Sequence, residues 1–259
     1  MRRMPIDPKI NSGNTLPHTD SLKPILAAQS SLIFRETFCP LMRHFVLIMH
    51  DMADAQLPEG LVPSIAPEYA VFEGGVRDSP EWGSAIIQVP WQHYLWTGDI
   101  RPLRQYYPAM QRYFGWLARR AENGLLLYGL GDWYDRGPRA PGQSQLTPAG
   151  LTATATFHED AMTLARIALL LGREQDAEVF AAAAFDIREA FNARFFDVQR
   201  GTYAGGSQTA NAMPLALHMV EDQYADDVLA ALLADIRNHR GALTAGDVGH
   251  RYVLRALAD

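Results

Sequence analysis

Apolar side chains recur at the helical spacing i, i+3, i+4 and i+7 through three long segments of the chain. Charged side chains lie on the opposite face of each segment, which predicts helices with one face in the core and one in water. The segments between them show less contrast between their faces: 81–98 is apolar nearly all round, and 150–172 and 207–220 are rich in small and apolar residues, which predicts helices buried on most sides. The chain therefore alternates buried and surface helices. The apolar positions of the surface helices are Leu103, Tyr106, Tyr107, Met110, Phe114, Leu117 and Ala121; Ala177, Phe180, Ala181, Ala184, Ile187, Phe191 and Phe195; and Ala225, Val228, Leu229, Leu232, Leu233 and Ile236.

The connections between these helices alternate in length as well. A short turn follows each buried helix, whereas a long loop precedes it. In an antiparallel array of helices, alternate connections lie at the same end, so the long loops are expected to gather on one face. Such a face of loops on a rigid scaffold is where function usually resides. The pattern is that of an α/α barrel built from hairpins of inner and outer helices. The long loops are 56–80, 123–149, 196–206 and 240–246.

The number of helices limits the size of this barrel. A closed ring of six hairpins needs twelve helices, so the pattern predicts an all-α fold, an incomplete (α/α)6 six-hairpin barrel with about eight of them. Residues 1–30 are expected to form an irregular N-terminal segment, and residues 31–259 the partial barrel catalytic domain. Short ribbons are predicted only within 125–131 and 195–204. The predicted helices are 31–55, 81–97, 100–122, 150–171, 173–195, 207–220, 222–239 and 247–258.

Capping residues support the predicted ends of the helices. A serine or threonine followed by proline is typical of a helix start, and glycine is typical of the position just after the last turn. The pairs are Ser79–Pro80 and Thr147–Pro148, and the glycines are Gly98 and Gly172.

Composition argues against several classes of function. A net charge of −6 without any basic run gives no electrostatic reason to expect a nucleic-acid partner. The single cysteine, Cys39, excludes a disulfide within the chain and favours a reducing, cytoplasmic location. No run of apolar residues is long enough for a membrane span, and the first residues do not form a secretory signal. No glycine-rich phosphate loop occurs, and the triplet at 158–160 points its side chains about 100° apart, so neither a cofactor nor a metal is expected.

Two of the long loops carry aromatic rings beside acids. The stretch YGLGDWYDRGP holds Asp132, Trp133 and Asp135, and the loop 56–80 runs into Glu81 and Trp82 at a helix start. An aromatic ring can stack on the apolar face of a sugar while carboxylates accept hydrogen bonds from its hydroxyl groups. Glycoside hydrolysis also requires two carboxyl groups, one on each side of the bond that is broken. The pattern therefore favours a carbohydrate site.

Each of these residues has a structural alternative. The two tryptophans are also the kind of residue that anchors a core. Asp132 and Asp135 are each suited to cap a turn in this glycine-rich stretch, and Glu81 is placed to interact favourably with a helix dipole. The residues alone leave both readings open.

Several long motifs resemble the catalytic six-hairpin domain of bacterial α-L-rhamnosidases, glycoside hydrolase family 78. The resemblance implies an (α/α)6 barrel, inverting hydrolysis of terminal α-L-rhamnosides and no organic cofactor. By the same resemblance, Trp82 and Trp133 match aromatic residues that line the rhamnose pocket, and Asp132 and Asp135 belong to the same motif. Many relatives have aspartate where this chain has Ser84. The motifs are DMADAQLPEGLVPSIAPEY, DSPEWGSAIIQVPWQHYLWTGD, GDWYDRGP, LTATATFHEDAMTLARIALLLG, FNARFFD, GSQTANAMPLAL and LTAGDVGHRYVLRAL.

The motifs that carry the general acid and the general base in this family are not found in the chain, so its catalytic residues are unknown. We therefore expect a truncated segment with little hydrolysis on its own. Two alternatives from other classes remain. One is a non-catalytic carbohydrate-binding module that uses Trp82 and Trp133. The other is a helical assembly subunit that self-associates through the open edges of the barrel, whose apolar surface favours association.

Overall fold

The computed structural model describes residues 45–72 and 76–258, and the residues from Leu47 onward belong to one compact unit. The predicted irregular segment 1–30 and the first part of the helix predicted at 31–55 lie outside the described residues. The boundary between the two predicted domains therefore stays a prediction.

Within the described residues, regular structure is almost entirely helical, as predicted for an all-α fold. A helix covers residues 45–54. A two-stranded antiparallel ribbon follows α7, with Phe196 paired to Tyr203 and Asp197 to Thr202. The elements after the first helix are α3 (Pro80–Gly83), α4 (Ala85–Thr97), α5 (Arg101–Arg120), α6 (Ala149–Leu170), α7 (Glu174–Phe195), β1 (Phe196–Asp197), β2 (Thr202–Tyr203), α8 (Gln208–Ala216), η3 (Asp222–Tyr224), α9 (Ala225–Asn238) and α10 (His250–Ala258).

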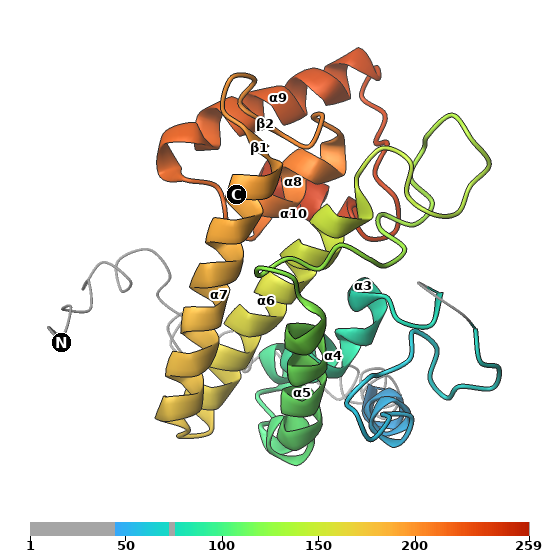
Figure 1. Ribbon diagram of the computed structural model, residues 1–259, viewed down its shortest axis with the longest axis vertical. Helices are drawn as coiled ribbons and strands as arrows, with labels where there is room; N and C mark the ends of the chain where they lie inside the picture. The colour runs from blue at the N-terminus through green and yellow to red at the C-terminus, as the bar shows by residue number, and fades with distance from the viewer. Residues whose placement is uncertain (1–44, 73–75, 259) are drawn as a thin grey trace, which may run out of the picture. The chain divides into compact units, whose positions relative to one another are not determined.

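Consecutive helices pack as hairpins, α4 with α5, α6 with α7 and α8 with α9 (Figure 1). The first helix of each hairpin also contacts the first helix of the next, so α4, α6, α8 and α10 form an inner row. The outer helices α5, α7 and α9 each keep an exposed face. This alternation of inner and outer helices is the arrangement predicted for part of an α/α barrel.

Helix α6 lies at the centre of this arrangement, in contact with α3, α4, α5, α7 and α8. Sixteen of its 22 residues are buried. Alanine, threonine and glycine fill its first half, and small side chains allow neighbouring elements to approach closely. At Gly150, for example, an added Cβ would lie 2.9 Å from Cδ2 of Leu127. The composition of α6 therefore explains how one helix accommodates so many neighbours.

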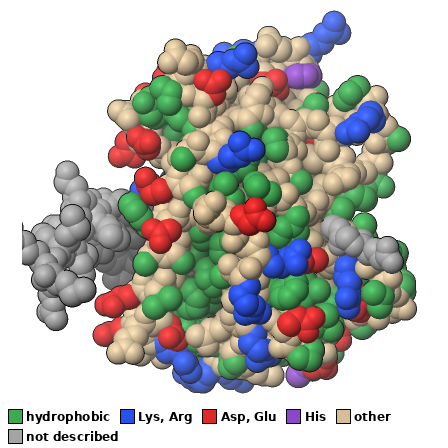
Figure 2. Space-filling model, in the orientation of Figure 1, with side chains coloured by type: hydrophobic (Ala, Val, Ile, Leu, Met, Phe, Trp, Pro, Cys, Tyr) green, Lys and Arg blue, Asp and Glu red, His purple; other side chains and the backbone are tan. Residues whose placement is uncertain are grey.

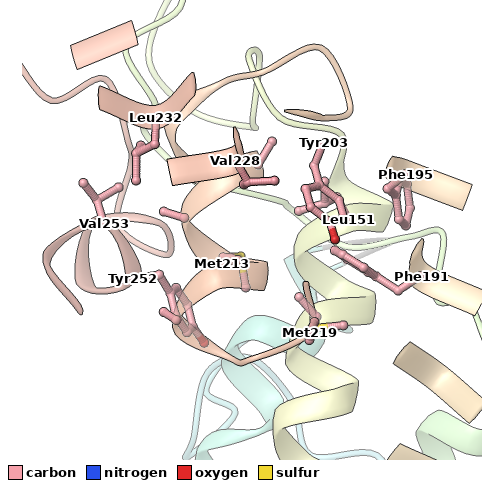
Figure 3. Packing of buried hydrophobic residues seen from close by; sticks show 14 residues of the cluster. Leu151, Phe191, Phe195, Tyr203, Met213, Met219, Val228, Leu232, Tyr252 and Val253 are labelled. Carbon is pink, nitrogen blue, oxygen red and sulfur yellow. The ribbon is translucent and has the colours of Figure 1, made fainter. Parts of the chain in front are cut away.

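A second part of the core joins α6 and α7 to the three last helices (Figure 3). The ribbon inserts Tyr203 into this cluster, where its ring lies 5.5 Å from that of Phe191. The Tyr203 hydroxyl donates to Asn192 Oδ1 at 2.8 Å, and the Asn192 amide donates to the Met219 carbonyl at 2.9 Å. One half-buried asparagine thus links the ribbon, α7 and the segment after α8. Figure 3 labels Leu151, Phe191, Phe195, Tyr203, Met213, Met219, Val228, Leu232, Tyr252 and Val253.

Some predicted helix ends are confirmed. Ser79 is the N-cap residue of α3, with Pro80 in the first turn, and Gly98 ends α4 with a φ of 71°. The prediction of Thr147 as an N-cap is wrong, because the cap is Pro148. Thr147 instead lies 2.6 Å, oxygen to oxygen, from the hydroxyl of Ser207, the N-cap of α8.

Several other predicted elements also differ in extent; for example, the helix predicted at 247–258 begins at His250. The helix predicted at 81–97 is divided into α3 and α4 at Ser84. The helix predicted at 207–220 ends at Ala216, because His218 adopts a left-handed conformation and Met219 N donates back to the Pro214 carbonyl, the hydrogen bond of a Schellman motif. The ribbon predicted within 125–131 is reduced to a single bridge between Glu122 and Leu125.

The described surface mixes charged and apolar side chains. On the face drawn in Figure 2, acidic and basic side chains are interspersed among apolar ones. Among the described residues, no helix is both long enough and apolar enough to cross a membrane.

Candidate functional site

The long loops meet at one end of the helices, as the alternating connections predicted. The Ser79 hydroxyl, at the start of α3, accepts a hydrogen bond of 3.0 Å from the backbone N–H of Leu130. The contact between Thr147 and Ser207 joins the starts of α6 and α8. The loop segment 129–135, called here the Trp133 loop, therefore lies among the N-terminal ends of the inner helices.

Asp132 secures the Trp133 loop to the C-terminal part of the chain. Its carboxylate is fully buried and accepts hydrogen bonds from the Thr209 hydroxyl at 2.5 Å and from the N–H groups of Gly246 and Gly249 at 2.9 and 2.7 Å. Both glycines are required sterically, because an added Cβ would collide with the backbone of the loop at Gly246 and with Thr209 at Gly249. Burial raises the pKa of Asp132, while these hydrogen bonds act in the opposite direction.

Asp135 closes the other end of the same loop. Its buried carboxylate accepts hydrogen bonds from the backbone N–H groups of Gln145 and Leu146, at 2.8 and 2.6 Å, and from the Ser144 hydroxyl at 3.2 Å. Residues 136–143 thus form a loop whose two ends are held together by the Asp135 carboxylate. This is the turn-forming role that the sequence left open for Asp135.

Trp133 is presented between these two aspartates. Its carbonyl accepts a hydrogen bond of 2.7 Å from the N–H of Asp247, while the next residue, Tyr134, has a φ of 64°. The Trp133 ring meets the Trp82 ring edge to face, with centroids 6.5 Å apart and planes at 89°. We call these two residues the aromatic pair. Both are half-buried, so each keeps part of its surface open.

Glu81 lies beside Trp82 on α3. Its carboxyl oxygens are each 2.6 Å from a hydroxyl group, Oε2 from Ser79 and Oε1 from Thr152. Burial of the carboxyl raises the pKa of Glu81 to about 7 against these two hydrogen bonds, and the charge of Asp132 acts in the same direction as burial. Glu81 is therefore an acid that exchanges its proton near neutral pH.

The structure thus brings together all five residues singled out in the sequence. Trp82 and Trp133 are in contact, Glu81 adjoins them on α3, and Asp132 and Asp135 bracket Trp133. The two aspartates direct their oxygens to donors of the chain itself. Chemically, the site offers two partly open aromatic rings and one carboxyl that titrates near neutrality, which suits a neutral ligand with an apolar face and hydroxyl groups.

Comparison with known proteins places the chain in a family. The family model described as the bacterial alpha-L-rhamnosidase 6 hairpin glycosidase domain matches residues 34–259. The chain belongs to this family. The resemblance seen in the motifs is thereby confirmed, together with the barrel fold that it implied.

Individual relatives of this rhamnosidase-family chain agree. It is 30% identical over 211 residues to an alpha-L-rhamnosidase of Streptomyces avermitilis. The matched residues cover 81% of this chain and 19% of the relative. An alpha-L-rhamnosidase of an Alteromonas species is 28% identical over 200 residues, 74% of this chain and 21% of the relative. The chain thus spans about a fifth of the length of these curated relatives.

Solved structures show the same similarity. The alpha-L-rhamnosidase from Dictyoglumus thermophilum superposes with a TM-score of 0.74 at 31% identity, over 81% of this chain and 24% of that one. The Streptomyces avermitilis enzyme, solved in complex with L-rhamnose, gives a TM-score of 0.72 at 29% identity, over 82% of this chain and 19% of that one.

Sequence reasoning missed the partners that hold the site of this rhamnosidase-family chain. Thr152 and Thr209 supply hydroxyl groups to Glu81 and Asp132, and Gly246 and Gly249 supply N–H groups. The only local signal was the polar residues at the starts of helices that are otherwise apolar. Nothing in that signal indicates which carboxylate each residue meets.

Ser84, where many relatives have aspartate, also has a partner that the sequence did not reveal. Its hydroxyl donates to Asp160, which is fully buried on α6 and also accepts a hydrogen bond of 2.8 Å from the Gln88 amide. Burial raises the pKa of Asp160 well above its usual value. Asp160 belongs to the triplet at 158–160, and among the described residues no cluster of His, Cys, Asp and Glu side chains is arranged to hold a metal ion.

Proposed function

We propose that this chain forms part of the sugar-binding site of an α-L-rhamnosidase, in which the aromatic pair contacts a terminal α-L-rhamnosyl group. The observation that carries the proposal is the edge-to-face contact of Trp82 and Trp133, since it joins α3 to the Trp133 loop at two residues, 51 positions apart, that match the family's pocket motifs. The contact leaves each ring partly open for a ligand.

The electrostatics of the site support a neutral ligand. The carboxylates of Asp132 and Asp135 are buried and accept hydrogen bonds from backbone N–H groups. Neither carboxylate therefore presents its charge to a ligand on the aromatic pair. Each carboxyl oxygen of Glu81 accepts one hydrogen bond from a hydroxyl group, which leaves lone pairs for a further hydroxyl donor. In this proposal Trp82 and Trp133 contact the sugar, Glu81 accepts a hydroxyl hydrogen bond, and Asp132 and Asp135 position Trp133.

The proposal includes weak hydrolysis by the chain alone. Inversion at a glycosidic carbon needs an acid and a base whose carboxyl groups stand about 6.5–9.5 Å apart on opposite sides of the bond. Of the three acids among the site residues, Asp132 and Asp135 are occupied by backbone N–H groups of other segments, which leaves Glu81. Because each of the two groups contributes about 10²–10⁴-fold to the rate, a site with one of them is expected to bind more than it turns over.

Titration of the purified chain with L-rhamnose tests the proposal directly. We expect saturable binding, and we expect Trp133→Ala to weaken it by about tenfold or more because the stacking surface is lost. The matched control is Trp96→Ala, since Trp96 is an exposed tryptophan in the last turn of α4. Absence of binding, or binding unchanged by Trp133→Ala, would contradict the proposal.

Two further predictions stand beside this one. A non-catalytic carbohydrate-binding role is distinguished by binding without any turnover of an aryl α-L-rhamnoside. Self-association through barrel edges is favoured by exposed apolar side chains on α10, where Leu254 and Leu257 are 52% and 43% exposed.

A further inference from the structure

Two contacts with α6 hold the residues on either side of Trp82. Directly before Trp82, the Glu81 carboxyl accepts a hydrogen bond of 2.6 Å from the Thr152 hydroxyl. Directly after α3, the Ser84 hydroxyl donates to the carboxylate of Asp160. Thr152 and Asp160 both belong to α6, which contacts α3 (Figure 1). Trp82 therefore lies between two contacts with the same buried helix.

A second hydrogen bond joins Asp160 to α4. The Gln88 side-chain amide, one turn after Ser84, donates to the carboxylate at 2.8 Å. Ser84 is the residue at which α3 ends and α4 begins, so Asp160 holds both ends of the first turn of α4. The Asp160 side chain is fully buried, which keeps water from competing for these two donors.

The same junction of α3 and α4 packs against α5. Gly83 lies so close to the ring of Tyr113 that an added Cβ would collide with it, and Tyr113 is fully buried. Apolar packing has no preferred direction, whereas the hydrogen bonds to Asp160 are directional. Asp160 therefore sets the orientation of the junction, and with it the orientation of Trp82.

The geometry of the aromatic pair depends on this orientation. The planes of the Trp82 and Trp133 rings meet at 89°, and the Trp133 loop is fixed separately by the hydrogen bonds of Asp132. A rotation of α3 would change the angle between the two rings and the surface that each ring leaves open to a ligand.

Ser84 stands where many relatives have aspartate. In this chain the carboxyl group that contacts the side chain at position 84 belongs to Asp160, on a different helix. A serine and an aspartate thus face each other across the contact. Their exchange would keep both chemical groups and the summed side-chain volume of the pair, a change that a core tolerates well.

We propose that Asp160 is a positioning residue of the sugar site: through Ser84 and Gln88 it orients Trp82, and it supplies from α6 the carboxyl group that many relatives carry at position 84. The effect on ligand affinity rests on the proposed function, because it assumes that the sugar contacts the aromatic pair. The effect on the geometry of the pair does not depend on that assumption.

Asp160→Ser tests the positioning role in the full chain with two measurements. L-rhamnose titration gives the affinity. Near-ultraviolet circular dichroism gives the part of the tryptophan signal that is lost in Trp133→Ala, called here the pair signal. We expect Asp160→Ser to reduce the pair signal and to weaken L-rhamnose binding about fivefold. A pair signal that is unchanged in Asp160→Ser would overturn the proposal.

Tyr203→Phe is the matched control for a general loss of stability. It removes a hydroxyl that donates to Asn192 in the second part of the core (Figure 3), on a ribbon that contacts α8 and α9. Both variants should melt below the wild type, but Tyr203→Phe should keep the pair signal and the affinity for L-rhamnose. Equal changes of signal and affinity in the two variants would show a general loss of structure and overturn the positioning role.

Asp160→Asn is the conservative variant, which should retain the fold. Burial raises the pKa of Asp160 well above its usual value, which favours the protonated carboxyl that a neutral amide resembles. The amide offers one acceptor to Gln88 and one donor to the Ser84 hydroxyl, which can rotate to accept. Asp160→Asn should therefore keep the pair signal and stay within about twofold of the wild type in affinity.

Exchange of the two residues tests the origin of the carboxyl group. Ser84→Asp alone places two carboxyl groups in contact in a buried site, which should lower the melting temperature. The double variant Ser84→Asp/Asp160→Ser has one carboxyl group again and should recover most of the pair signal and affinity lost in Asp160→Ser. Losses in the double variant equal to the sum of those in the single variants would overturn the assignment.

The two measurements separate this proposal from the proposed function. If the wild type does not bind L-rhamnose, the proposed function fails, while the pair signal in Asp160→Ser and in the exchanged variant still decides whether Asp160 orients Trp82. If L-rhamnose binds and Asp160→Ser changes neither the affinity nor the pair signal, the positioning role fails and the sugar site stands.

Discussion

The two segments that meet at the aromatic pair hold their acids in different ways. In the Trp133 loop, Asp132 and Asp135 accept hydrogen bonds from backbone N–H groups. The direction of these donors is fixed by the fold. On α3, the Glu81 carboxyl accepts hydrogen bonds from the hydroxyl groups of Ser79 and Thr152, which can rotate to donate or to accept. The loop therefore uses its acids for structure, and α3 keeps an acid that can gain or lose a proton.

The largest effect on the free energy of unfolding is expected from a substitution in the Trp133 loop. Asp132→Ala leaves two buried N–H groups and the Thr209 hydroxyl without their acceptor, so we expect the free energy of unfolding to fall by about 4 kcal/mol. Chemical denaturation measures the loss. The control is Asp186→Ala, which removes an exposed aspartate from α7 and should change stability by less than about 0.5 kcal/mol. A loss below about 1 kcal/mol for Asp132→Ala would erase the contrast between the two segments.

The next effect depends on pH and belongs to α3. Because the pKa of Glu81 is about 7 in the folded chain and 4.5 in the reference state, the folded chain holds a proton between these values that the unfolded chain has released. Stability due to Glu81 is therefore present at low pH and is lost as the pH rises from about 4.5 to 7, by about 3 kcal/mol in total. Glu81→Gln, which cannot ionise, should remove this loss.

Unfolding curves of the wild type and of Glu81→Gln at pH 5 and pH 8 measure the difference. Glu122→Gln, at an exposed acid after α5, should follow the wild type at both values. A difference between the wild type and Glu81→Gln that is the same at pH 5 and pH 8 would show that Glu81 does not titrate in this range.

The smallest effect isolates one hydroxyl group at Glu81. Thr152→Val removes the donor to Oε1, and we expect a loss of about 1.5 kcal/mol at pH 8, where Glu81 is ionised, and a smaller loss at pH 5. The control lies one turn further along the same helix. The buried hydroxyl of Thr156 has no partner among the described residues, so Thr156→Val should be neutral or stabilising. Equal losses for the two variants would mean that the hydroxyl of Thr152 does not stabilise the carboxylate.

The sequence predicted well the features that depend on residues close together in the chain. It predicted poorly those that depend on distant residues. Helical periodicity is local, and it predicted α5 and α7 to within a residue or two at each end. The cap at Ser79 is local as well. The partners of Asp132 at Gly246 and Gly249 are 114 and 117 residues away in the chain, and no local pattern indicates such a pairing.

The sequence by itself determined the alternation of buried and surface helices, the gathering of the long loops and the presence of aromatic and acidic residues in two of them, because these depend on side-chain spacing along a few turns. Its motifs also determined the family. Only the tertiary structure decided that Trp82 contacts Trp133, that Asp132 accepts hydrogen bonds from a segment distant in the chain, and that Glu81 titrates near neutrality. Contact, burial and hydrogen bonding depend on which helices pack together, and these are what separate an acid that holds a loop from one that exchanges a proton.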